Sequence, residues 1–152
     1  MNATKPRDRS SIIALCCLGI ILALVLGVGL ASHLVLRHLV QTSPLWICVV
    51  LGFRHSRATY WVGLPLFLFW LILMGVIWTY LLGISHLVTG HFSPIEIVMT
   101  LVVGASSIVG MGSIVRSKFS FSPSGAAALF VIMAIFQLLC FRLSLLPSIA
   151  HR

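Results

Sequence analysis

The chain has 152 residues, of which 60% are hydrophobic and only 8% are charged. Soluble domains carry about a quarter charged residues, so this composition excludes a soluble globular protein and predicts one whose solvent is lipid. The net charge is +8, but the basic residues stand in ones and twos at the ends of apolar segments, a pattern that indicates membrane orientation and excludes nucleic-acid binding.

Four long apolar segments predict an all-α integral membrane protein. After a basic N-terminal tail at residues 1–10, they cover residues 11–36, 60–84, 94–115 and 125–146. Each reaches the roughly 20 residues that a helix needs to cross a bilayer. We expect a single multipass helical domain over residues 11–146 and a short C-terminal tail at residues 147–152. Basic residues before the first segment and Gly29-Leu30-Ala31 before Ser32 resemble a cleavable leader, but the segment is longer than such leaders usually are, which favours an uncleaved anchor over a cleaved one.

A fifth, shorter apolar stretch lies between the first two long segments, at residues 45–53. At about 1.5 Å per residue, a helix of this length reaches about half way across the hydrocarbon. The stretch is compatible with a re-entrant half-helix, with a short fifth span that extends back through Leu39, or with an interfacial element. A β-hairpin that turns at residues 54–57 is a further alternative.

Ser-Pro pairs predict three helix starts, because a Ser N-cap accepts a hydrogen bond from the first turn and Pro suits the next position. The pairs are Ser43-Pro44, Ser93-Pro94 and Ser122-Pro123. Glu96 lies three residues after Ser93 and completes a capping box. An acid in a membrane segment is a functional candidate, but here the position favours capping.

Paired positive charges predict the topology. Arg54 and Arg57 precede the second long segment, and Arg116 and Lys118 follow the third, whereas residues 85–93 contain no Lys or Arg. The positive-inside rule puts both basic loops and the N-terminal tail in the cytoplasm. All three can lie there only if residues 39–53 cross the membrane. We expect the protein in a bacterial cytoplasmic (inner) membrane.

Two similar stretches contain most of the histidines. SHLVLRH at residues 32–38 is nearly repeated as SHLVTGH at residues 85–91, which indicates either an ancient duplication or a coincidence in a chain of few letters. The four imidazoles are candidate ligands for a metal or a haem at the outer face: His33, His38, His86 and His91. Against this, a five-residue separation on one helix points two side chains apart, whereas helical metal pairs prefer three or four.

Small residues predict close helix packing. Gly19, Ala23, Gly27 and Ala31 recur every four residues in the first segment, and the third segment contains a group that includes Ser106 and Gly110. Such residues let helix backbones approach closely in lipid. In the last segment, we expect Gln137 to form a hydrogen bond to another helix.

No motif indicates catalysis: the sequence has no nucleophile with a matching base, no phosphate-binding glycine loop and no paired carboxylates. We therefore expect a protein without enzymatic activity or cofactor, whose partners are the lipid bilayer and other membrane subunits or further copies of itself. The leading expectation is an accessory subunit or homo-oligomer. A small transporter or channel is the first alternative, and a metal- or haem-handling protein that uses the external histidines is the second.

Overall fold

The computed structural model describes residues 6–84, 92–117 and 122–150, and these residues form helices and turns without a β-strand. The helices are α1 (Pro6–Leu22), which continues as a π-helical segment η1 (Ala23–Gly29), then α2 (Val35–Phe53), α3 (Ala58–Leu81), α4 (Pro94–Val115), α5 (Pro123–Ser144) and the short α6 (Pro147–Ala150). The all-helical expectation is confirmed for these residues. The β-hairpin alternative is excluded, because residues 54–57 form a tight turn between two helices.

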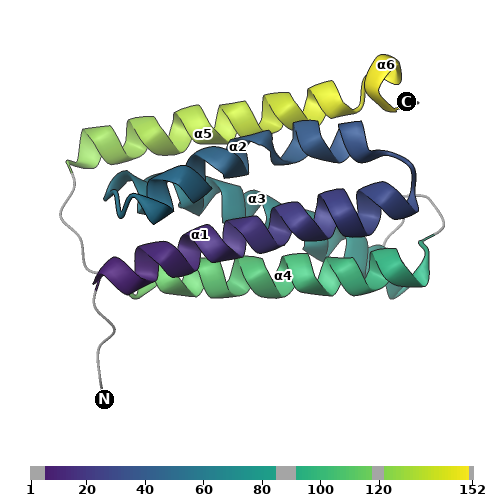
Figure 1. Ribbon diagram of the computed structural model, residues 1–152, viewed down its shortest axis with the longest axis horizontal. Helices are drawn as coiled ribbons and strands as arrows, with labels where there is room; N and C mark the ends of the chain where they lie inside the picture. The colour runs from purple at the N-terminus through teal and green to yellow at the C-terminus, as the bar shows by residue number, and fades with distance from the viewer. Residues whose placement is uncertain (1–5, 85–91, 118–121, 151–152) are drawn as a thin grey trace.

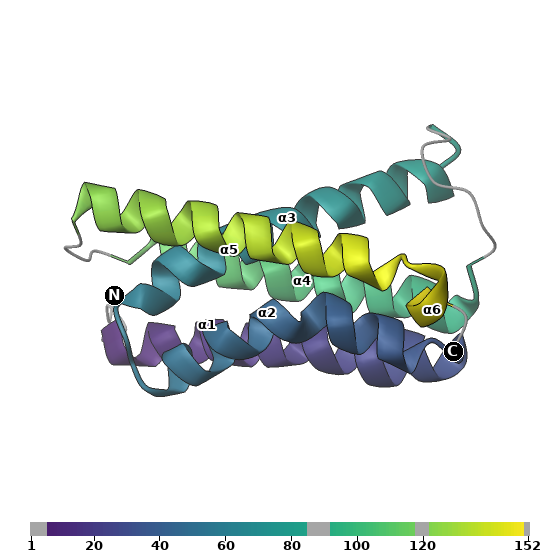
Figure 2. The same cartoon turned by 90° about the horizontal axis from the view of Figure 1, so that it is seen from above.

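Five of the helical segments are long and apolar enough to cross a membrane, where the sequence predicted four and a shorter fifth. They lie side by side in one bundle, and successive helices run in opposite directions (Figures 1 and 2). The difference lies in α2, which is a continuous helix of 19 residues and is therefore longer than the half-helix expected of a re-entrant segment. Of the five, α2 is the least apolar, because His38, Gln41 and Thr42 interrupt its hydrophobic pattern.

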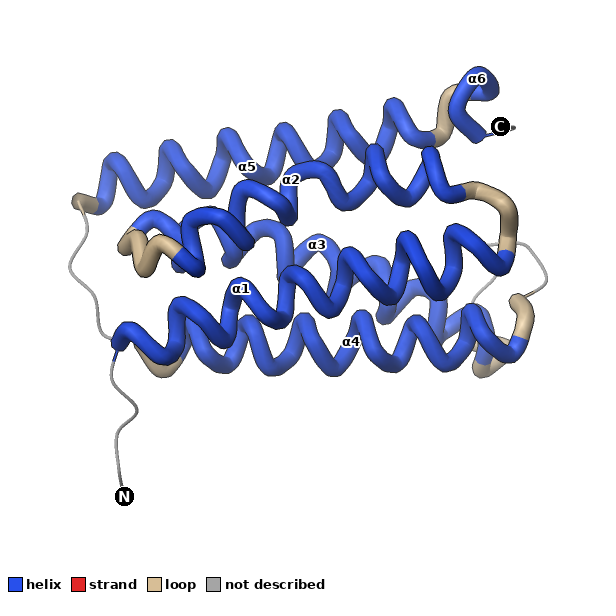
Figure 3. Tube along the Cα trace, viewed as in Figure 1, coloured by secondary structure: helices blue, strands red, loops and turns tan. Residues whose placement is uncertain are grey.

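The first expected helix ends earlier than residue 36. Residues 32–34 form the turn to α2 (Figure 3), and His33 adopts a positive φ of 56° within it. The other long helices begin and end within three residues of the expected limits. Helix α1 begins at Pro6 and α6 lies at Pro147–Ala150, both in segments that the sequence treated as tails.

Two of the three Ser-Pro pairs begin helices. Ser93 Oγ accepts a hydrogen bond from the Glu96 amide at 3.3 Å, and the Glu96 carboxylate accepts one from the Ser93 amide at 2.7 Å, which is the capping-box geometry. Ser122 Oγ accepts from the Gly125 amide at 3.3 Å. The third prediction is wrong: Pro44 lies inside α2, nine residues after its start at Val35.

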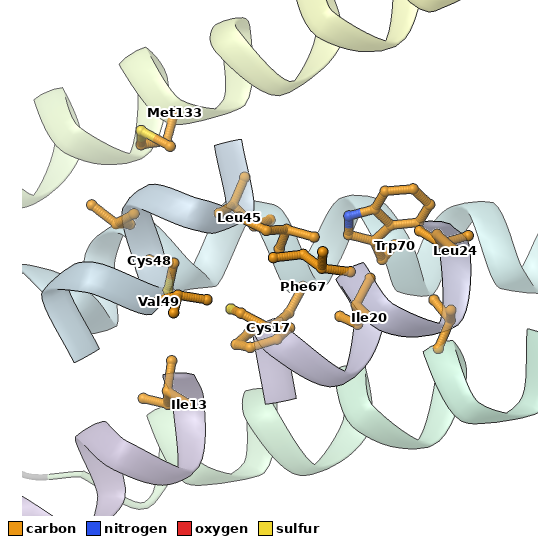
Figure 4. Packing of buried hydrophobic residues seen from close by; sticks show 14 of the residues in the cluster. Ile13, Cys17, Ile20, Leu24, Leu45, Cys48, Val49, Phe67, Trp70 and Met133 are labelled. Atoms are coloured by element: carbon orange, nitrogen blue, oxygen red, sulfur yellow. The ribbon is translucent and has the colours of Figure 1, made fainter. Parts of the chain in front are cut away.

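The core forms where α1, α2 and α3 meet (Figure 4). Its largest fully buried side chains include Trp70, Phe67, Ile13, Ile20 and Leu45. Helix α4 packs against this core through Gly110, since a Cβ there would lie 2.4 Å from Phe67 Cζ. Close approach of the helix backbones therefore depends on glycine at this position.

The expected orientation residues gather at one end of the bundle. Arg9 donates a hydrogen bond to the carbonyl of Arg116, which ends α4, and Ser10 Oγ donates to the carbonyl of Gly52 at 3.0 Å, two residues before Arg54. Arg57 immediately precedes α3. Lys118 lies outside the described residues. We call this the basic end; the starts of α2 and α4 lie at the opposite end.

Candidate functional site

A cavity of about 350 Å³ lies at the end of the bundle opposite the basic end. Its walls come from η1, the start of α2, the C-terminal half of α3, the start of α4 and one side chain of α5. Most of the lining is apolar, including Leu24, Val28, Leu73, Ile77, Phe92 and Phe141. The polar lining residues are Ser32, Arg37, His38, Gln41, Glu96 and Thr100. A mostly apolar cavity with a few converging polar groups is the usual form of a small-molecule site.

The local backbone explains why the cavity opens here. Helix α1 changes to π-helical winding at Ala23–Gly29, and such winding is rare and often occurs at functional sites. Gly29 ends this segment, and a Cβ there would lie 3.2 Å from Val35 Cα and 3.4 Å from His38 Cδ2. Glycine at this position thus lets the start of α2 approach η1. The C-terminal half of α3 leans away from α1 and α2 (Figure 2), which leaves room between them.

Two opposite charges line the cavity without pairing. Arg37 and Glu96 are each the third residue of their helix, α2 and α4. Arg37 Nε is buried and has no hydrogen-bond partner within the described part of the chain, and no ion pair joins Arg37 to Glu96 there. One oxygen of Glu96 accepts from the Ser93 amide, but a backbone amide does not cancel the carboxylate charge.

A chain of polar side chains continues from the cavity into the bundle. His38 Nδ1 lies 3.0 Å from Gln41 Oε1, and Gln41 Nε2 donates to Ser144 Oγ of α5, also at 3.0 Å. Because the Gln41 oxygen can only accept, this arrangement assigns the hydrogen to His38 Nδ1 and leaves Nε2 as an acceptor. The chain links α2 to α5 and orients the His38 ring at the cavity wall.

Pro44 explains the neighbouring polar contacts. Proline lacks the amide hydrogen that would bond the carbonyl four residues earlier, and its ring disturbs the helix around it. Ser43 Oγ donates to that carbonyl, Val40 O, at 2.8 Å, and Gln137 Nε2 of α5 donates to the carbonyl of Gln41 at 3.1 Å. The expectation that Gln137 bonds to another helix is confirmed. Its Oε1 has no partner among the described residues.

The structure separates the candidate metal ligands that it describes. His38 is buried in α2, while His33 lies in the preceding turn and not on the same helix. His86 and His91 lie outside the described residues. Within residues 6–84, 92–117 and 122–150, no three His, Cys, Asp or Glu side chains gather closely enough to hold a metal ion.

The predicted packing residues of the first helix face α4 over part of its length. A Cβ at Gly19 would lie 3.2 Å from Ser106 Oγ, and one at Gly27 would lie 2.5 Å from Met99 Cγ. Ala23 is buried between them, whereas Ala31 is exposed. The π-helical winding changes the number of residues per turn, so an every-fourth pattern does not stay on one face through η1.

Other glycines remain uncovered. A Cβ added at Gly75 of α3 or at Gly104 or Gly112 of α4 would meet no atom within 4 Å. Gly75 and Gly104 line a groove between α3 and α4 with a volume of about 470 Å³. The other lining residues are Leu71, Met74, Trp78, Thr100, Leu101, Ala105 and Ile108. We call this surface the α3–α4 groove.

Sequence reasoning missed most of the cavity. Arg37 had no assigned role, and Glu96 was assigned to capping alone. The spacing of Arg37, His38 and Gln41 within one turn of a helix was a usable signal, but it required α2 to be recognised as a full-length helix. No known protein family, curated protein or solved structure matches the chain, so the functional argument depends on the cavity and the α3–α4 groove.

Proposed function

We propose that this chain is an integral membrane protein that crosses a bacterial cytoplasmic membrane five times and acts by association, as an accessory subunit or a homo-oligomer. Five helices of sufficient length and apolarity support insertion. The gathering of Arg54, Arg57 and Arg116 at one end supports a cytoplasmic location for that end. With five crossings, the cavity then faces the outer side.

The α3–α4 groove carries the proposal of association. Gly19, Gly27 and Gly110 are covered by neighbouring side chains within the chain, whereas Gly75 and Gly104 line an open, mostly apolar groove. In lipid, helices associate where small residues let a partner backbone approach closely. The groove therefore offers a place for a helix of a second copy or of another subunit.

Replacement of Gly104 by leucine tests this proposal. The added side chain fills the groove but meets no atom of the same chain within 4 Å at its Cβ, so we expect the protomer to fold normally and to associate at least about tenfold more weakly. Gly112→Leu is the matched control, because Gly112 is equally open and lies outside the groove. The measurement is the mass of the complex purified in mild detergent, together with the identity of any companion.

Two results contradict the proposal. One is a parent protein that is purely monomeric without a companion. The other is a Gly104→Leu variant that retains the parent complex.

A small transporter is the second candidate, because the cavity has polar lining residues and lies within the helical bundle. Fully buried Leu45, Cys48 and Phe67 lie between the cavity and the basic end. Transport would therefore require the helices to rearrange around these side chains.

A further inference from the structure

The position of Arg37 in α2 is energetically unfavourable for a cation unless a negatively charged group pairs with it. Arg37 lies in the first turn of α2, where the positive end of the helix dipole disfavours a cation. Its side chain is half-buried, and its Nε is fully buried without a hydrogen-bond partner among the described residues. A buried polar atom without a partner is unfavourable. The position therefore favours a bound anion over a structural role in the bare protein.

The start of α2 adds further anion-binding capacity beside Arg37. Leu34 precedes the helix and supplies no side-chain cap, whereas α4 and α5 are capped by Ser93 and Ser122. Uncapped amides at a helix start favour a negatively charged group. The guanidinium and these amides together suit the oxygens of a phosphate.

Glu96 requires a partner of the opposite sign. Its capping bond uses one carboxylate oxygen, and the described residues place no Lys or Arg in ion-pair contact with it. The cavity thus presents one unpaired cation and one unpaired anion on different walls. A single ligand with both charges would satisfy both residues.

The depth and the apolar walls indicate a lipid. Arg37 and Glu96 lie about 3 Å inside the helix starts at the rise of an α-helix, which is the level of the headgroups if the chain spans a bilayer. Deeper in the cavity, Leu24, Leu73 and Phe141 provide apolar contacts. Charged residues near the helix starts and apolar walls deeper in the cavity match a phospholipid, in which a charged headgroup is joined to hydrocarbon chains.

We propose that this cavity binds the headgroup of a phospholipid that carries both a phosphate and a primary ammonium, with the phosphate on Arg37 and the ammonium on Glu96. The inference depends on the membrane insertion proposed above and not on association through the α3–α4 groove. Since the groove is tested with Gly104→Leu and the cavity with other variants, the two proposals fail separately.

The test is native mass spectrometry of the delipidated, detergent-purified protein, titrated with phosphatidylethanolamine, phosphatidylglycerol and phosphatidylcholine of identical acyl chains. We expect phosphatidylethanolamine to bind most tightly. Phosphatidylglycerol lacks the cation, and the quaternary ammonium of phosphatidylcholine cannot donate a hydrogen bond to Glu96. Loss of one charge-assisted hydrogen bond corresponds to roughly 10- to 100-fold in affinity.

The variants separate the two contacts. Arg37→Gln should lower the affinity for phosphatidylethanolamine and for phosphatidylglycerol alike, by roughly 10- to 100-fold. Glu96→Gln should lower the affinity for phosphatidylethanolamine alone, so that this lipid no longer binds more tightly than phosphatidylglycerol. Glutamine keeps the capping box intact. Arg142→Gln is the control, because Arg142 is exposed in the last turn of α5 and does not line the cavity; its lipid binding should equal that of the parent. Each variant is compared after its helical content and elution volume match the parent.

Equal binding of the three lipids by the parent overturns the proposal, as does an Arg37→Gln or Glu96→Gln variant that binds like the parent. Water-soluble phosphoethanolamine is added in competition at the same concentration as the lipid. We expect it to displace little, because it lacks the apolar part; efficient displacement would show a soluble zwitterion as the ligand and refute the lipid.

Discussion

Replacement of Gly110 by alanine should destabilise the bundle even though alanine is the better helix former. The new Cβ would lie 2.4, 2.6 and 2.7 Å from three ring atoms of Phe67, and this ring is fully buried. Overpacking a filled core costs about 1–3 kcal/mol. The higher helix propensity of alanine stabilises the folded state by about 0.5–1 kcal/mol relative to glycine. The midpoints of these two ranges leave a net loss of about 1 kcal/mol in the free energy of unfolding.

Gly112→Ala is the matched control on the same helix. A Cβ there meets nothing within 4 Å, so only the propensity gain remains and the variant should equal or exceed the parent in stability. The difference between the two variants isolates the clash, about 1–3 kcal/mol. Unfolding by SDS in mixed micelles, followed by circular dichroism, measures both. Equal unfolding midpoints for Gly110→Ala and Gly112→Ala would refute the packing described for Phe67.

Two further outcomes follow from the helix ends and from Pro44. A cysteine introduced at Ile84, which is 73% exposed, should react with a membrane-impermeant maleimide in intact cells. A cysteine introduced at Ser117 should react only after the membrane is opened. The reverse pattern would contradict the proposed topology. Ser43→Ala should lower the free energy of unfolding by about 1 kcal/mol, because the carbonyl freed by Pro44 loses its hydrogen-bond donor. Ser113→Ala should leave stability nearly unchanged, since the Ser113 hydroxyl bonds a carbonyl within a regular helix. Equal SDS unfolding midpoints for the two variants would contradict this account.

Composition and helix-start signals predicted much of the architecture. Segments of more than 20 apolar residues can only be helices in lipid, and the starts at Pro94 and Pro123 follow from their Ser-Pro caps. The same Ser-Pro signal failed at Pro44. There, the lost backbone bond is replaced by Ser43 Oγ and supported by Gln137 of another helix, and a contact from α5 is invisible to local pattern reasoning.

The cavity could be predicted only in part. That Glu96 caps α4 follows from a four-residue motif, but that it shares a cavity with Arg37 depends on how α2 and α4 lie in the bundle. The π-helical winding of Ala23–Gly29 also has no local sequence signature. Leu24 and Val28 of this segment line the cavity, and Ala31, which follows it, is exposed; an every-fourth pattern of small residues could not indicate either placement.

The contacts between α2 and α5 have a consequence for how the protein is made. Gln41 and its carbonyl are satisfied by Ser144 and Gln137, which follow 103 and 96 residues later in the chain. A nascent chain therefore exposes the polar groups of its least apolar span until the fifth helix leaves the ribosome. In a chain inserted as proposed, α2 depends during that interval on the insertion machinery or on α1 to remain in the bilayer. A chain interrupted before α5 should accordingly be recognised and degraded by membrane quality control, even though four of its five long helices are complete.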